Sequence, residues 1–126
     1  MNRCGECTLC CRLTAVPEIA KPVGIWCPNC DIGNGCKIYD TRPPSCVKFE
    51  CFWYTHKLSI DLRPDKCKVI LERLVDQPMF LALVDFNRSD AWKKPLVRSV
   101  INSLLKSDNV VIVSVAAASL VTVFTL

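Results

Sequence analysis

Three features are scarce or missing in this sequence of 126 residues: histidine, a secretory signal and an apolar run of membrane-spanning length. His56 is the only histidine, so nucleophilic catalysis by a cysteine–histidine pair has one candidate base and no supporting motif. No Ser-His-Asp pattern, phosphate-binding loop or pair of acidic catalytic residues is visible either. We expect His56 to be a surface residue, and we predict that the protein is not an enzyme.

The missing apolar runs also indicate the cellular compartment in which the chain folds. Met1-Asn2-Arg3-Cys4 lacks the apolar run of a secretory signal. The 17 residues from Val110 to Leu126 are uncharged, but they fall short of the ~20 that a spanning helix needs. Valine and threonine dominate this segment, and both residues suit strands. We therefore expect a cytoplasmic protein that does not enter a membrane.

Cysteine is the residue present in excess. There are ten cysteines, and nine of them lie between Cys4 and Cys51. A reduced cytosol leaves thiols available for metal, whereas an oxidising compartment pairs them as disulfides. A Zn²⁺ ion or a [4Fe–4S]²⁺ core held by four thiolates has a charge of about −2, so one site lowers the formal net charge from +4 to about +2 and two sites lower it to about zero. The basic excess is therefore weak support for a nucleic-acid partner.

The cysteine spacing suits two kinds of metal site. Two residues between cysteines let both sulfurs face one metal, which is why this spacing recurs in zinc knuckles and iron–sulfur loops. The Cys4/Cys7 and Cys27/Cys30 pairs together give C-x2-C-x19-C-x2-C, close to a four-cysteine zinc site. The alternative grouping adds Cys10 to the first pair and takes only Cys27 from the second, as in ferredoxin-type clusters. The predicted cofactor is therefore zinc or iron, with a 4Fe-4S cluster as one form.

A longer motif resembles a known family. Cys4-x2-Cys7-x2-Cys10-Cys11 is followed by Trp26-Cys27 and then by Gly35-Cys36-Lys37-Ile38-Tyr39-x2-Arg42-Pro43-x2-Cys46-x2-Phe49-x-Cys51. Over residues 4–53 this pattern resembles the CxxCxxCC cysteine-cluster family (YkgJ-like), whose members are described as zinc- or iron-chelating domains. The segments Leu62–Asp65 and Asp90–Trp92 resemble a longer variant found in bacteria and their phages. The resemblance implies a metal module and specifies no reaction.

Nine cysteines are candidate metal ligands. We rank Cys4, Cys7, Cys27, Cys36 and Cys46 first, followed by Cys11, Cys10, Cys51 and Cys30.

Some other residues have predicted supporting roles. Cys46 is expected in the first turn of a helix that begins near Pro44, where the helix dipole lowers a thiol pKa. Arg42 is either a hydrogen-bond donor to metal-bound sulfurs or a surface residue in a turn. Cys67 is expected to be a small buried hydrophobe within a strand. Three aromatic residues are expected to shield the metal or to join the core: Trp26, Phe49 and Trp53.

The pattern predicts an α+β fold, in which an N-terminal metal-bound cysteine knuckle with few regular elements packs on a small C-terminal sheet of three or four strands covered by one amphipathic helix. Residues 1–56 form the cysteine-rich metal-binding module, and residues 57–126 form a ββαβ-type packing half of the same domain. Ala116-Ala117-Ala118 lacks polar turn residues, so Val110–Leu126 either forms a hairpin or pairs with another chain. The expected strands are Lys66–Leu74, Met79–Phe86, Val110–Val115 and Leu120–Leu126; the expected helical segments are Pro17–Ala20, Pro43–Tyr54 and Ser89 or Asp90 to Lys106.

These features predict a non-enzymatic metal-binding protein whose metal organises a structural or assembly module. A coordination sphere filled by cysteine leaves no open position for a substrate. Two alternatives stay open: a phage tail or baseplate component assembled in the cytoplasm into a virion, and a redox or iron-handling iron–sulfur protein. The apolar residues Val123–Leu126 favour a protein partner or a larger assembly, and no small-molecule substrate is evident.

Overall fold

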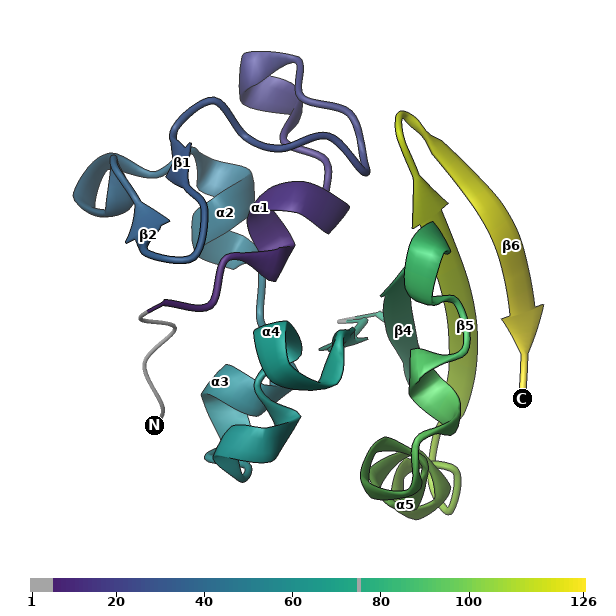
Figure 1. Ribbon diagram of the computed structural model, residues 1–126. Helices are drawn as coiled ribbons and strands as arrows, with labels where there is room; N and C mark the ends of the chain where they lie inside the picture. The colour runs from purple at the N-terminus through teal and green to yellow at the C-terminus, as the bar shows by residue number, and fades with distance from the viewer. Residues whose placement is uncertain (1–5, 75) are drawn as a thin grey trace.

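The computed structural model describes residues 6–74 and 76–126, so the predicted ligand Cys4 lies outside the described residues. The fold is α+β, as predicted, and its centre is a four-stranded sheet (Figure 1). The β3–β4 and β5–β6 pairs are antiparallel, whereas β4 and β5 are parallel. In order across the sheet, the strands are β3 (Val69–Arg73), β4 (Met79–Asp85), β5 (Asn109–Ala116) and β6 (Ser119–Thr125).

Strands β3, β4 and β5 are buried on both faces, which explains their nearly continuous apolar sequences. Side chains alternate between the faces, so Val69 and Leu71 of β3 belong to one core while Ile70 between them belongs to the other. The parallel pairing of β4 and β5 requires a long connection between them. That connection contains the 3₁₀ turns η4 (Phe86–Arg88) and η5 (Ala91–Lys93) and the helix α5 (Pro95–Leu104).

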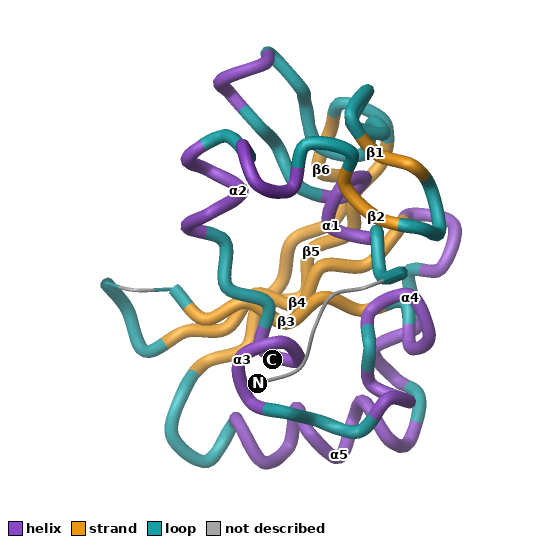
Figure 2. The backbone as a smooth tube through the Cα atoms, turned by 90° about the vertical axis from the view of Figure 1, so that its left-hand side faces the viewer, coloured by secondary structure: helices purple, strands orange, loops and turns teal. Residues whose placement is uncertain are grey.

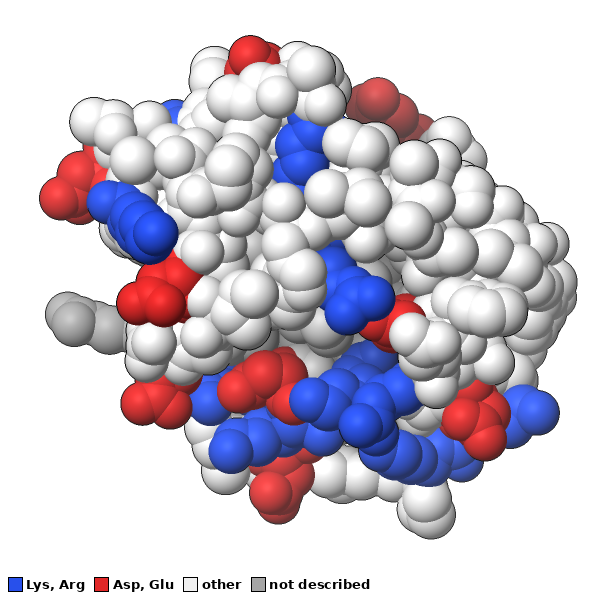
Figure 3. Space-filling model, turned by 45° about the horizontal axis from the view of Figure 1, so that its top comes forward, with Lys and Arg blue, Asp and Glu red and all other residues white. Residues whose placement is uncertain are grey.

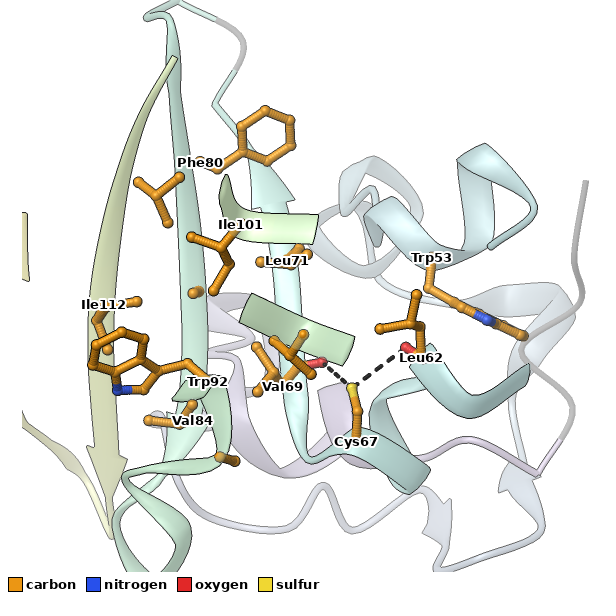
Figure 4. Close-up of a cluster of buried hydrophobic side chains, with 14 residues drawn as sticks. Trp53, Leu62, Cys67, Val69, Leu71, Phe80, Val84, Trp92, Ile101 and Ile112 are labelled. Carbon is orange, nitrogen blue, oxygen red and sulfur yellow. Dashed lines mark hydrogen bonds between the residues drawn. The ribbon is translucent and has the colours of Figure 1, made fainter. Parts of the chain in front are cut away.

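The core on the first face lies between the sheet and α5. Ile101 of α5 and Val84 of β4 are fully buried there, and Ile112 of β5 is almost fully buried (Figure 4). Cys67 belongs to the same core, which confirms that it is a buried hydrophobe, and its thiol lies 3.4 Å from the carbonyl oxygens of Leu62 and Val69. Helix α3 (Phe52–His56), the turn η3 (Ile60–Leu62) and helix α4 (Pro64–Cys67) complete this side.

The cysteine-rich segment covers the opposite face, so the sheet lies between it and α5 (Figure 2). Leu13, at the end of helix α1 (Leu9–Leu13), packs in the second core with Ile70 and Val113. An ion pair of 3.3 Å between Arg12 Nε and Asp85 Oδ2 fastens the same helix to the end of β4. The remaining elements of the segment are short: η1 (Pro17–Ile19), β1 (Cys30–Asp31), β2 (Gly35–Cys36), η2 (Tyr39–Thr41) and α2 (Pro44–Lys48).

Two predicted helices are interrupted. The expected helix from Ser89 or Asp90 to Lys106 is divided into η5 and α5, because Lys94 precedes Pro95 and is extended, with φ −57° and ψ 139°. The expected helix from Pro43 to Tyr54 is divided into α2 and α3. Its break has a tertiary cause, since Cys51 leaves the helical conformation and forms an antiparallel bridge with Glu72 of β3.

The other expected strands and turns are present with shifted boundaries, but the expected position of Cys67 within a strand is wrong. Cys67 ends helix α4 and does not lie in a strand, because Lys68 adopts a left-handed conformation before β3 begins. The predicted turn at Pro17–Ala20 is the 3₁₀ turn η1. The last two strands form a hairpin without polar turn residues, since Ala118 supplies the required positive φ of 58°. Within the described residues, no helix is long and apolar enough to span a bilayer.

Candidate metal centre

Most of the predicted ligands surround one cavity. The cavity has a volume of about 650 Å³ and lies between the cysteine-rich segment, helix α3 and the second face of the sheet, where Ile70 closes it. Each described cysteine outside the core is a free, partly buried thiol. The cysteines that line the cavity are Cys7, Cys10, Cys11, Cys27, Cys36, Cys46 and Cys51.

A tight turn brings the middle cysteines together. Cys30 donates its backbone N–H to the Cys27 carbonyl at 3.1 Å, which closes the Cys27-Pro28-Asn29-Cys30 turn. Cys30 also lies opposite Cys36 in the two-stranded β1–β2 sheet. A further bond of 2.9 Å joins the Cys27 N–H to the Cys11 carbonyl and ties the turn to α1. Local C-x2-C geometry and a small hairpin thus present thiols from three segments to one region.

The thiols around α1 interact with one another. Cys11 is hydrogen-bonded through its side chain to Cys10 and to Cys30. The bond to Cys10, followed by burial, raises the Cys11 pKa. Burial raises the pKa of Cys30 to about 12, and the bond to Cys11 acts in the same direction. Cys30 therefore belongs to the same thiol network, although it does not line the cavity.

Cys46 occupies the predicted position in the first turn of α2. Its pKa is nevertheless raised, mainly by burial, and the nearby Cys11 and Cys27 thiols act in the same direction. The expectation that the helix dipole would lower this pKa is wrong. Burial and the neighbouring thiols outweigh any lowering at the N-terminus of this helix of five residues.

Cys7 and Cys51 form a second group of thiols within the cavity. Burial is the main cause that raises the pKa of Cys7 to about 12, and Cys51 contributes to the shift. Burial also raises the pKa of Cys51. A backbone bond from Asp65 to Cys7 connects this group to α4, where Asp65 itself forms a bidentate ion pair with Arg63 at 2.6 and 2.7 Å.

Lys21 places a buried cation beside the thiols. Its Nζ donates hydrogen bonds to the carbonyl oxygens of Arg12, Thr14 and Pro22, so it caps the C-terminal end of α1. Burial lowers the Lys21 pKa, while the thiols of Cys27 and other cysteines act in the opposite direction. The sequence offered no signal for this residue, because a single lysine in a loop is normally exposed.

Glu18 is a second residue that the sequence analysis missed. The Ser45 backbone N–H donates to Glu18 Oε2 at 3.0 Å, and the Ser45 hydroxyl donates to Oε1. These bonds lower the pKa of Glu18 and fasten η1 to the start of α2, next to Cys46. A carboxylate at a helix N-terminus is a recognisable stabilising feature, but here it comes from 27 residues away in the sequence.

The predicted aromatic and basic neighbours are divided between the cavity and the surface. Phe49 and Trp53 line the cavity, whereas Trp26 does not and instead lies near Arg12, 5.8 Å from its guanidinium carbon. Arg42 also lines the cavity, but its guanidinium stacks over Tyr39 and donates to the Tyr39 carbonyl at 2.9 Å. His56 is exposed and stacks on Phe52, as expected of a surface histidine.

The described thiols are not gathered around a single point. Among residues 6–74 and 76–126, no three His, Cys, Asp or Glu side chains converge closely enough to hold one ion. The four-cysteine zinc grouping is not tested, because Cys4 lies outside these residues. What the structure does bring together is a shared cavity with more cysteines than one ion needs.

Comparison with known proteins adds no relative. No protein-family model, no curated protein and no solved structure matches this chain. The resemblance to the CxxCxxCC cysteine-cluster family therefore stays a prediction from the sequence.

Proposed function

We propose that this protein binds metal through the thiolates of the cysteine cavity, and that the metal holds the cysteine-rich half in place on the sheet. The observation that supports this most directly is the convergence of seven cysteines, from segments far apart in the sequence, on one cavity. They are free thiols that lie partly buried, which is the state from which cysteine binds metal.

The small core of the cysteine-rich segment supports a structural role for the metal. Residues 6–50 bury few side chains, and most of their regular elements are two to five residues long. Loops that bury so little apolar surface need another source of stability, which a structural metal supplies. The buried residues in this range are Thr8, Leu13, Val16, Lys21 and Gly24.

The shape of the site favours an iron–sulfur cluster over a single zinc ion. With Zn–S bonds of about 2.3 Å, the four sulfurs around a zinc ion lie within about 4 Å of one another. The seven described cysteines of the site instead surround a cavity of about 650 Å³. A cluster of several irons and inorganic sulfides fills the space between more widely separated thiolates.

The raised thiol pKa values do not favour thiol catalysis, and Lys21 is a charge that favours thiolates. A nucleophilic cysteine needs a lowered pKa, whereas burial raises the pKa of Cys7, Cys46 and Cys51. Lys21 supplies one buried positive charge close to thiols that become anionic when they bind metal. We therefore retain the non-enzymatic role, and a redox or iron-handling role is the alternative if a cluster proves to cycle.

The test is metal and sulfide analysis of anaerobically purified protein, together with its optical spectrum. We expect iron, inorganic sulfide and a brown protein with broad absorption near ~400 nm. Colourless protein with stoichiometric zinc would retain the metal-binding role and reject the cluster. Protein that contains neither metal nor sulfide, or whose cysteines are paired as cystines, would contradict the proposal.

Two variants test whether the metal is bound in the cavity. C27S/C46S removes two thiols from the cavity and should lower the metal content by at least about half. C67A is the matched control, because Cys67 lies in the core between Leu62 and Val69 and does not line this cavity. Equal metal loss in both variants would indicate general unfolding instead of ligand removal.

A further inference from the structure

Strand β6 is an open edge of the sheet. Among residues 6–74 and 76–126 it pairs with β5 alone, and all of its residues are exposed. The pairing shifts register between Ser114 and Val115 of β5, so Val121 has no partner in β5. Leu126 donates its N–H to the Val110 carbonyl at 2.9 Å, and Phe124 lies opposite Ile112. Alternate residues of an antiparallel pair are hydrogen-bonded, so the backbone groups of Val123 and Thr125 face away from β5. Such unpaired groups are a template for another strand.

Unlike most edge strands, β6 has no charge to prevent pairing. Its exposed side chains include Val121 and Val123, which are 48% and 57% exposed. No charged residue and no proline occurs from Val110 to Leu126. The right-hand side of the molecule, where β6 lies in Figure 1, has a broad surface without Lys, Arg, Asp or Glu in Figure 3. Natural proteins usually protect an edge with Lys, Pro, a β-bulge or a covering element, and of these β6 has only the register shift at Val121.

The other edge strand shows such protection. Strand β3 includes Glu72 and Arg73, and Cys51 forms a bridge to Glu72 from the adjoining segment. The two edges of the sheet are therefore different, and only β6 combines an apolar surface with free backbone groups. A neutral strand also offers no charge pattern that would select an acidic or a basic partner.

The residue pattern of β6 identifies the partner. The strand reads Ser-Leu-Val-Thr-Val-Phe-Thr, which is symmetric in residue character about Thr122. We propose that a second copy of this chain pairs with β6, antiparallel about a two-fold axis at Thr122. In this register Val121 lies opposite Val123 of the other copy, and Leu120 lies opposite Phe124. Both are favourable cross-strand pairs, and hydroxyl residues meet at the centre and at the ends.

This pairing is closed and satisfies the open edge. Each copy supplies the same surface to the other, so the two sheets join into one and no β6 edge is left to extend a fibre. The inference is independent of the metal site, because β6 lies outside the cysteine cavity. The prediction of bound metal and the prediction of a dimer can therefore be contradicted independently of each other.

The experiment uses two variants with opposite charges. In V121K/V123K, like charges oppose each other across the proposed interface, and V121E/V123E has the same conflict. We expect the wild-type chain to be a dimer by light scattering. Each variant alone should have a dimer dissociation constant at least about 100-fold higher than that of the wild type. Mixing the two variants should restore a dimer that contains one copy of each, because lysine then opposes glutamate at every contact.

The controls separate pairing from folding and from simple loss of apolar surface. I60K places a lysine at another exposed apolar residue, outside β6, and should leave the dimer unchanged. Circular dichroism and metal content should match the wild type in all variants. A wild-type chain that is monomeric at about 100 μM, a dimer that survives both charged variants, or a mixture that stays monomeric would overturn the proposal.

Discussion

A Cβ atom added to Gly24 would lie only 1.9 Å from the carbonyl oxygen of Ala116, at the tip of the β5–β6 hairpin. Gly24 also has a φ of +73°, which side chains rarely tolerate. Next to it, the Ala118 N–H donates to the Val23 carbonyl at 2.8 Å. The cysteine-rich segment and the hairpin therefore meet backbone to backbone.

The first prediction concerns this contact. G24A should lower the free energy of unfolding by about 2–4 kcal/mol, because it combines backbone strain with a clash against main-chain atoms. G33A is the matched control, since Gly33 has a similar φ of +81° but nothing within 4 Å of the added Cβ. Its cost should be about 1 kcal/mol, from the backbone alone. Equal losses in urea unfolding would show that the close approach is not important.

The second prediction concerns the buried cation. K21M keeps most of the apolar side chain but removes the Nζ that bonds the carbonyls of Arg12, Thr14 and Pro22. We expect the free energy of unfolding to fall by about 1–3 kcal/mol, measured by urea titration of the protein as purified. K106M is the control, because Lys106 is exposed and its loss should change stability by less than about 0.5 kcal/mol. A K21M variant with an unchanged free energy of unfolding would contradict the capping role.

The third prediction concerns the pH dependence of metal uptake. Burial raises the pKa values of Cys7 and Cys30 to about 12, so these thiols are protonated at neutral pH before metal binds. Each thiol that becomes a metal-bound thiolate releases a proton, and the apparent affinity then rises about tenfold per pH unit for each such ligand. Chelator competition at about pH 6.5 and 7.5 measures this slope. An affinity independent of pH would exclude these thiols as ligands.

The fourth prediction concerns the metal-free protein at alkaline pH. A thiol whose pKa rises from 9.0 to about 12 on folding stabilises the folded state while it stays protonated. This contribution is complete below about pH 9 and is lost as the pH rises toward 12, because the unfolded chain releases its protons first. The melting temperature of the apoprotein should therefore fall over this range. The melting temperature of C7A should fall less steeply with pH than that of the wild type. An equal slope in both proteins would contradict the raised pKa of Cys7.

Several elements could be predicted because their signals are local. The apolar β-branched runs around Val69–Leu71 and Val110–Val115 predict buried strands, and both are strands. The apolar residues Val97 and Ile101 of the expected amphipathic helix lie on the buried face of α5, whereas Leu96 is 47% exposed. The break before Pro95 was not predicted, although the residue before a proline is known to avoid the helical conformation.

Other features depend on contacts between distant residues. The bridge from Cys51 to Glu72 divides the expected helix after Pro43, and no local pattern announces it. Burial raises the Cys46 pKa although its position in α2 predicted the opposite shift. Lys21 becomes a buried cap only because the turn around it closes on α1.

The sequence by itself determined the α+β composition, the buried strands and the concentration of thiols in one half of the chain, because these follow from residue type and spacing along a short stretch. Only the tertiary structure decided which thiols share a cavity, which charge lies beside them and which strand is left open at the edge of the sheet. Those depend on how separate segments pack, and burial then sets the pKa values of the groups enclosed.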